Sequence, residues 1–82
     1  MKVWFIQGFT KEIQVFYDIN NGALKSFTVA DDIVIEELDK KLETDFFLNE
    51  PISEVYLKGH TKALKDMEDY YKQKEGVTIQ WL

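Results

Sequence analysis

Hydrophobic and polar residues follow strand-like patterns through the first third of the chain. Residues 3–6 read V-W-F-I, a continuous run that is typical of a strand covered on both faces at the centre of a sheet. Residues 12–20 alternate between apolar and polar positions, Asn21-Gly22 follows, and apolar residues return over 24–29. Asn-Gly favours a type I′ turn, because both residues accept the positive φ angles that this turn requires. The pattern therefore predicts three strands, of which the second and third form a hairpin.

The turn also predicts the register of that hairpin. A two-residue loop at Asn21-Gly22 places Phe16 opposite Phe27 on neighbouring strands. A cross-strand aromatic pair of this kind stabilises a sheet by roughly 0.2–1 kcal/mol. In this register the two rings lie on the face opposite to the main apolar stripe of the strand 12–20.

A helical period follows over residues 31–44. Asp31 or Asp32 is placed to cap a helix in which Ile35, Leu38 and Leu42 recur at spacings of three and four. The β-branched run over 33–35 also allows the first turn to continue the preceding strand. Residues 45–53, which hold the only proline, are expected to form a connection anchored by Phe46 and Phe47.

The last third predicts a strand, a helix and a strand. Residues 54–58 alternate as a short strand, Thr61 is placed to cap a helix that runs to Glu75, and Gly76 is placed to stop it. An apolar stripe on that helix comprises Leu64, Met67 and Tyr71. Residues 77–81 alternate as a final strand. A short strand-helix-strand unit of this kind is a crossover, so its two strands are expected to lie parallel.

These elements predict one α/β (α+β) domain over residues 1–82. Its single mixed sheet would contain an antiparallel meander of three strands, followed by a helix and a C-terminal parallel strand-helix-strand unit. This order resembles the ribonuclease-H-like and actin-like folds in miniature. The resemblance implies metal-binding carboxylates at the middle of the first strand and at the end of the fourth. These segments read V-W-F-I-Q-G and Y-L-K-G-H, and neither contains an acidic residue. The segment 8–11, G-F-T-K, resembles a phosphate-binding loop only faintly, so fold alone assigns no function.

Composition narrows the function classes. The chain has 82 residues, a net charge of −5 and no cysteine, which excludes disulfides, thiolate nucleophiles and zinc-thiolate sites. No apolar stretch is as long as the roughly 18 residues of a membrane helix, and a signal-peptide pattern is absent. We expect a cytoplasmic protein without enzymatic activity, cofactor or metal site, and without direct contact to nucleic acid or membrane.

The charges are unevenly distributed. All ten basic residues are lysine, and residues 31–54 hold nine acids against two lysines. Such a segment attracts basic protein surfaces, as inhibitors from phages and other mobile elements do when they mimic nucleic acid. The alternative is a solvated helix face that keeps the chain soluble. The candidate acidic binding face comprises Asp31, Asp32, Glu36, Glu37, Asp39 and Glu43.

Two further surfaces are candidates. The turn Gly59, His60, Thr61 and Lys62 leads into a helix, so its backbone amides and lysine could hold a small anion or nucleotide; the simpler interpretation is a helix cap. The chain also has twelve aromatic residues, more than so short a chain buries completely. Phe16 and Phe27 on an open sheet face would form a partner surface, such as a homodimer contact, unless one helix covers each face.

The sequence thus predicts a small acidic protein that binds another protein, with the acidic face as the first candidate contact. Self-association through the sheet face is the alternative, and a weak anion or nucleotide site at 59–62 is the third.

Overall fold

The computed structural model describes residues 1–7, 12–19, 23–30, 33–46 and 51–82, with the backbone alone at 12, 17–19, 23–27, 30, 45 and 46. The described residues form the strands β1 (Lys2–Gln7), β2 (Glu12–Ile19), β3 (Ala23–Ala30), β4 (Glu54–Lys58) and β5 (Thr78–Trp81). They also form the helices α1 (Ile35–Lys41) and α2 (Lys62–Lys72), and α1 continues into a π-helical turn, η1 (Leu42–Phe46).

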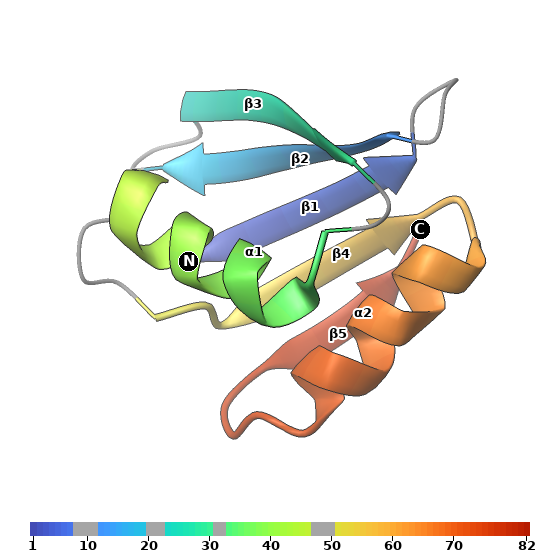
Figure 1. Cartoon of the computed structure of the whole chain (residues 1–82). Coiled ribbons are helices and arrows are strands. Elements are labelled where there is room, and N and C mark those ends of the chain that lie inside the picture. The colour runs from blue at the N-terminus through green and yellow to red at the C-terminus, as the bar shows by residue number, and fades with distance from the viewer. Residues whose placement is uncertain (8–11, 20–22, 31–32, 47–50) are drawn as a thin grey trace.

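The strands make one mixed sheet in the order β3-β2-β1-β4-β5 (Figure 1). β1 pairs antiparallel with β2, and β2 pairs antiparallel with β3. β4 pairs parallel with β1 on its other side, and β5 pairs parallel with β4. The predicted fold class is confirmed, and so is the central position of β1.

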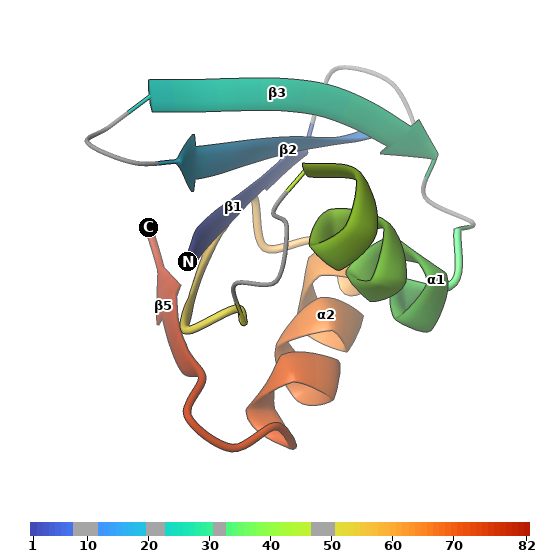
Figure 2. The same ribbon diagram turned by 90° about the vertical axis from the view of Figure 1, so that its left-hand side faces the viewer.

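The helices α1 and α2 lie on the same side of this sheet (Figure 2). The connections from β3 to β4 and from β4 to β5 each join parallel strands, and both move in the same direction across the sheet. Because such connections almost always share one hand, their helices fall on one face. The expectation that β1 is covered on both faces is therefore wrong. In β1, Val3 and Phe5 are fully buried, whereas Trp4 and Ile6 are only half-buried.

The core lies between the helices and the covered face of the sheet. The strands β1, β2 and β4 contribute alternate residues to it, as the two-residue period of a strand requires. The stripe predicted on α2 is buried throughout, and so are Leu38 and Leu42 after the start of α1. The buried apolar residues are Val3, Phe5, Ile13, Val15, Val29, Leu38, Leu42, Ile52, Val55, Leu57, Leu64, Met67 and Tyr71.

The hairpin pairs one residue out of the predicted register. Phe27 lies opposite Val15, and Phe16 lies opposite Ser26, so the predicted Phe16–Phe27 pair is wrong. The predicted register would have placed Thr28 opposite the buried Val15. The observed one instead aligns apolar positions of both strands on the covered face, and burial outweighs the local preference of an Asn-Gly turn. The residues of the turn, 20–22, lie outside the described part of the chain.

The first helix starts later than predicted. Val34 is its N-cap, with extended backbone (φ −72°, ψ 128°) and no side-chain hydrogen bond at the cap. The predicted cap at Asp31 or Asp32 is therefore wrong, because the β-branched residues 33 and 34 favour extended backbone and stay outside the helix. The predicted helix to residue 44 ends instead at Lys41 and passes into η1. The proposed anchors Phe46 and Phe47 have no described side chain.

The cap of the second helix is confirmed. The Thr61 side-chain oxygen accepts a hydrogen bond from the backbone N–H of Leu64, at 3.3 Å. The helix ends earlier than the predicted Glu75, with Gln73 as its C-cap. The backbone N–H groups of Gln73 and Lys74 bond three residues back, which tightens this end of the helix. Gly76 adopts φ +75° in the turn that leads to β5.

Replacing the cap residue tests whether α2 depends on this hydrogen bond. We expect Thr61→Ala to lower the free energy of unfolding by about 1 kcal/mol, because one N–H group at the helix start loses its partner. Thr61→Ser keeps the hydroxyl and should stay near the wild-type value. Urea unfolding followed by circular dichroism measures both variants, and equal losses for alanine and serine would contradict the capping role.

Candidate functional site

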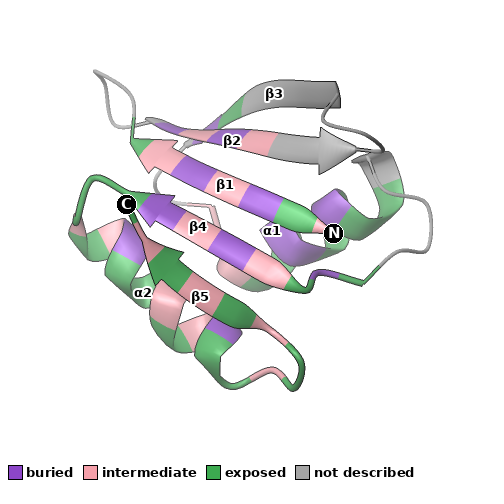
Figure 3. Cartoon of the chain, turned by 180° about the vertical axis from the view of Figure 1, so that it is seen from behind, coloured by how far each residue is buried: buried purple, intermediate pink, exposed green. Residues whose placement is uncertain are grey.

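A row of aromatic side chains crosses the face of the sheet that α1 and α2 leave uncovered. Trp4 on β1 is paired with Phe16 on β2 and with Tyr56 on β4, so the three residues stand side by side on neighbouring strands. The Trp4 and Tyr56 rings are 5.2 Å apart between centroids and are tilted by 47°. All three side chains are half-buried. Figure 3 shows this face, with half-buried and buried residues alternating along β1 and β4.

Polar and charged side chains surround the aromatic row. The ammonium group of Lys2 lies 3.6 Å from the Glu54 carboxylate, and the Tyr56 hydroxyl donates a 2.9 Å hydrogen bond to the same carboxylate. Lys58 is exposed at the other end of β4, and Gln80 on β5 is exposed beside Tyr56. An apolar, aromatic centre inside a polar rim is the usual anatomy of a protein–protein contact. We call Trp4, Phe16 and Tyr56, with their rim residues Lys2, Glu54 and Lys58, the open-face patch.

The indole N–H of Trp4 is buried, and no described residue accepts a hydrogen bond from it. A buried donor without an acceptor costs about 1–3 kcal/mol. The centre of the patch is therefore less stable than it would be if the Trp4 N–H had an acceptor.

The predicted sheet-face pair is only partly present in the patch. Phe16 is there, but the register places Phe27 opposite the buried Val15, and the Phe27 side chain lies outside the described part of the chain. Trp4 and Tyr56 were missed as site residues. Their places in the alternating pattern were visible in the sequence, but their contact depends on the parallel register between β1 and β4.

The predicted acidic face is divided by the structure. Glu36, Glu37 and Glu43 are exposed along α1 and η1, as expected of a binding or solvated face. However, Lys40 follows on the same helix and lies 4.0 Å from the Glu36 carboxylate, which offsets part of the negative charge. Asp31 and Asp32 lie outside the described residues.

Asp39 does not belong to an exposed acidic face. Its side chain is only 8% exposed and forms an ion pair with Lys74, beyond the end of α2. The other carboxylate oxygen, Oδ1, is buried and has no hydrogen-bond partner among the described residues. The ammonium group of Lys74 lies 4.8 Å from the centre of the Tyr70 ring. Asp39 therefore ties α1 to the turn after α2, which corrects its place in the predicted binding face.

The Asp39 contact changes the titration of Lys74. Partial burial by itself lowers the pKa of the Lys74 ammonium group. Hydrogen bonds to Asp39 and Tyr70, together with their negative charge, outweigh burial, so the pKa is raised above the ordinary value of 10.5.

The predicted anion turn has a clear structural role. Gly59 and His60 adopt positive φ angles of 127° and 52°, and Thr61 caps α2. The His60 imidazole stacks on the Trp81 indole, with centroids 4.4 Å apart and planes 13° from parallel. Lys62 is exposed at the helix start. These contacts explain the turn without a ligand, and anion binding there stays a prediction.

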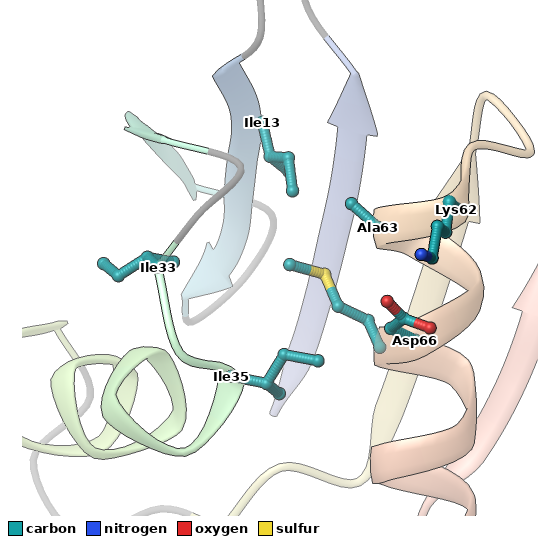
Figure 4. Close-up of a pocket in the computed structure, with 7 residues that line it drawn as sticks. Ile13, Ile33, Ile35, Lys62, Ala63 and Asp66 are labelled. Carbon is teal, nitrogen blue, oxygen red and sulfur yellow. The ribbon is translucent and has the colours of Figure 1, made fainter.

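A cleft of about 380 Å³ separates α2 from the segment that leads into α1 (Figure 4). Its walls are mostly apolar, and Lys62 and Asp66 stand on its α2 side. The lining residues are Ile13, Ile33, Ile35, Lys62, Ala63, Asp66 and Met67. One ammonium and one carboxylate together select neither an anion nor a cation, so the cleft indicates no particular ligand.

Comparisons with protein-family models, curated proteins and solved structures found no significant match. Within the described ranges, no group of three or more histidine, aspartate or glutamate residues is placed to hold a metal ion. None of the described helices is long and apolar enough to cross a membrane. Of the candidate sites, the open-face patch is therefore the one that the observed arrangement of side chains supports best.

The pKa of Lys74 predicts how the Asp39 contact depends on pH. Because the folded pKa is raised, the contact stabilises the protein fully below pH 10.5, and the contribution is lost as the pH rises through the folded value. We expect Lys74→Met to be less stable than wild type at neutral pH, with the difference shrinking at pH values above 10.5. Urea unfolding across this range measures it.

Lys72→Met, at an exposed position in the same region, is the matched control and should show no such trend. A Lys74→Met deficit that stays constant through the alkaline range would contradict the role of the ion pair.

Proposed function

We propose that the protein acts by binding protein rather than by catalysis, and that the open-face patch is its contact surface for a second copy of the chain. The observation that carries this proposal is the position of α1 and α2 on one side of the sheet, which leaves Trp4, Phe16 and Tyr56 on the other. The proposal includes the cytoplasmic location expected from the sequence.

The residue types in the patch support a protein partner. Tryptophan and tyrosine are enriched at the centres of protein interfaces, where they bury a large area at a small cost in side-chain entropy. Trp4, Phe16 and Tyr56 are each partly exposed and stand in one row, so a flat partner surface can cover them together. Packing of two sheets face to face, about 10 Å apart, is a common way to bury such a row.

The charge distribution favours a second copy over a basic partner at this surface. The described side chains at the rim include both signs: Lys2 and Glu54, which already form an ion pair, and Lys58. The exposed carboxylates of Glu37 and Glu43 belong to α1 and η1, on the opposite side of the sheet. Two copies that meet through their sheets therefore keep these acids far apart, although each chain carries −5.

A charged substitution in the aromatic row tests the proposal. We expect the wild-type protein to show a concentration-dependent dimer by light scattering after size exclusion. Phe16→Lys should shift it to monomer, because a lysine at this position would bring two like charges into a desolvated contact. Asp69→Lys, at an exposed position on α2, is the matched control and should leave the dimer intact.

Circular dichroism checks that both variants are folded. A wild-type protein that stays monomeric at high concentration would overturn the proposal, as would a folded Phe16→Lys variant that dimerises with wild-type affinity.

A further inference from the structure

The open face of β4 carries opposite charges at equal distances from Tyr56. Glu54 precedes Tyr56 by two residues and Lys58 follows it by two, so all three share one face of the strand. Val55 and Leu57, between them, are fully buried on the covered face. Reversal of the strand direction therefore exchanges the position of the negative charge with that of the positive one.

This arrangement is self-complementary under a two-fold rotation. In a dimer of two identical chains, a contact from one residue to another occurs twice, once in each direction. The relevant two-fold axis lies in the plane between the two sheets, runs perpendicular to β4 and passes over Tyr56. It places β4 against its own copy, which runs in the opposite direction. Glu54 then faces Lys58 of the second copy, and Lys58 faces the second copy's Glu54.

The alternative two-fold axis is parallel to β4. It would place each Glu54 against its copy and each Lys58 against its copy, so like charges would meet at both ends of the strand. Like charges brought together at an interface cost free energy and suppress that arrangement. The charges on β4 thus distinguish the two ways in which the same face can meet itself.

The aromatic row fits the first axis. Trp4 is the Cα partner of both Tyr56 and Phe16, so the three residues lie on one line across the strands. An axis perpendicular to the strands at the level of Tyr56 therefore runs along the whole row. Each ring then packs beside its own copy at the centre of the contact, and the charged residues lie toward the two ends.

We infer that the protein forms an antiparallel face-to-face dimer in which Glu54 of each copy pairs with Lys58 of the other. This inference rests on the proposed function and adds the orientation of the two copies. Within each chain Glu54 also contacts Lys2 and the Tyr56 hydroxyl, which hold its carboxylate at the rim of the patch. Lys58 is exposed and reaches the partner without displacing a buried group.

Charge reversal on β4 tests the orientation. We expect Glu54→Lys and Lys58→Glu each to raise the dimer Kd about tenfold, because both symmetric contacts become repulsive. An equimolar mixture of the two variants should form a heterodimer with a Kd near the wild-type value, since opposite charges meet again at both contacts. Sedimentation of each variant and of the mixture measures these constants.

The comparison with wild type is decisive. In the parallel arrangement like charges already meet in the wild-type dimer, so each variant alone would match wild type and the mixture would bind more tightly than wild type. Lys65→Glu, at an exposed position on α2, is the control and should behave as wild type both alone and in mixtures. Circular dichroism shows whether each variant is folded.

The outcomes separate the two proposals. Variants that are each weaker than wild type alone, together with a mixture that regains the wild-type Kd, support the antiparallel orientation. A wild-type dimer that is dissociated by Phe16→Lys, but whose β4 variants each dimerise as tightly as wild type or whose mixture binds more tightly than wild type, would overturn the orientation and keep the sheet as the contact. A wild-type protein that is monomeric at every concentration would overturn the proposed function, and the orientation with it.

Discussion

The structure depends on one constraint of chain topology. The chain crosses twice between parallel strands, first from β3 to β4 and then from β4 to β5, and both crossings move toward the same edge of the sheet. Connections that share a hand and a direction place their helices on the same face. α1 and α2 therefore build one core on one side (Figure 2), and the described helices leave the other face of the sheet uncovered.

This one-sided core divides the residues of every strand between two environments. On β1 and β4, Val3, Phe5, Val55 and Leu57 are fully buried, whereas the residues between them are half-buried. The continuous apolar run of β1 is therefore not explained by burial in the core. Trp4 and Ile6 supply apolar area to a face that α1 and α2 do not cover, and partly exposed aromatic area of this kind favours association. The fold itself thus supports the proposed contact.

The elements and their order were predictable because each strand and helix has either a clear period or, in β1, a continuous apolar run. The bounds of β4, the Thr61 cap and the buried stripe on α2 follow from residues close together in sequence. The hairpin register was predicted wrongly, because the Asn-Gly preference is local, whereas the alignment of apolar positions with Val15 depends on burial in the core. The position of both helices could have been inferred from the predicted strand order alone.

The candidate site was predicted less completely than the fold. Phe16 was identified from its place in the alternating pattern, but the contact between Trp4 and Tyr56 depends on the pairing of β1 with β4, two strands that are distant in sequence. Asp39 was assigned to the acidic binding face by its place in a run of acids. Its burial depends on Lys74, and no spacing in the sequence indicates that these two residues meet.

The fluorescence of Trp4 tests the central claim most directly, because the two tryptophans lie on different sides of the molecule. Trp4 belongs to the open-face patch, whereas Trp81 stacks on His60 and donates a hydrogen bond to Glu68 of α2. In a Trp81→Phe variant all tryptophan emission comes from Trp4. The account predicts that this emission shifts to longer wavelength on dilution, as the dimer dissociates and Trp4 meets water. An emission maximum that is unchanged from high to low concentration, in a folded protein, would contradict it.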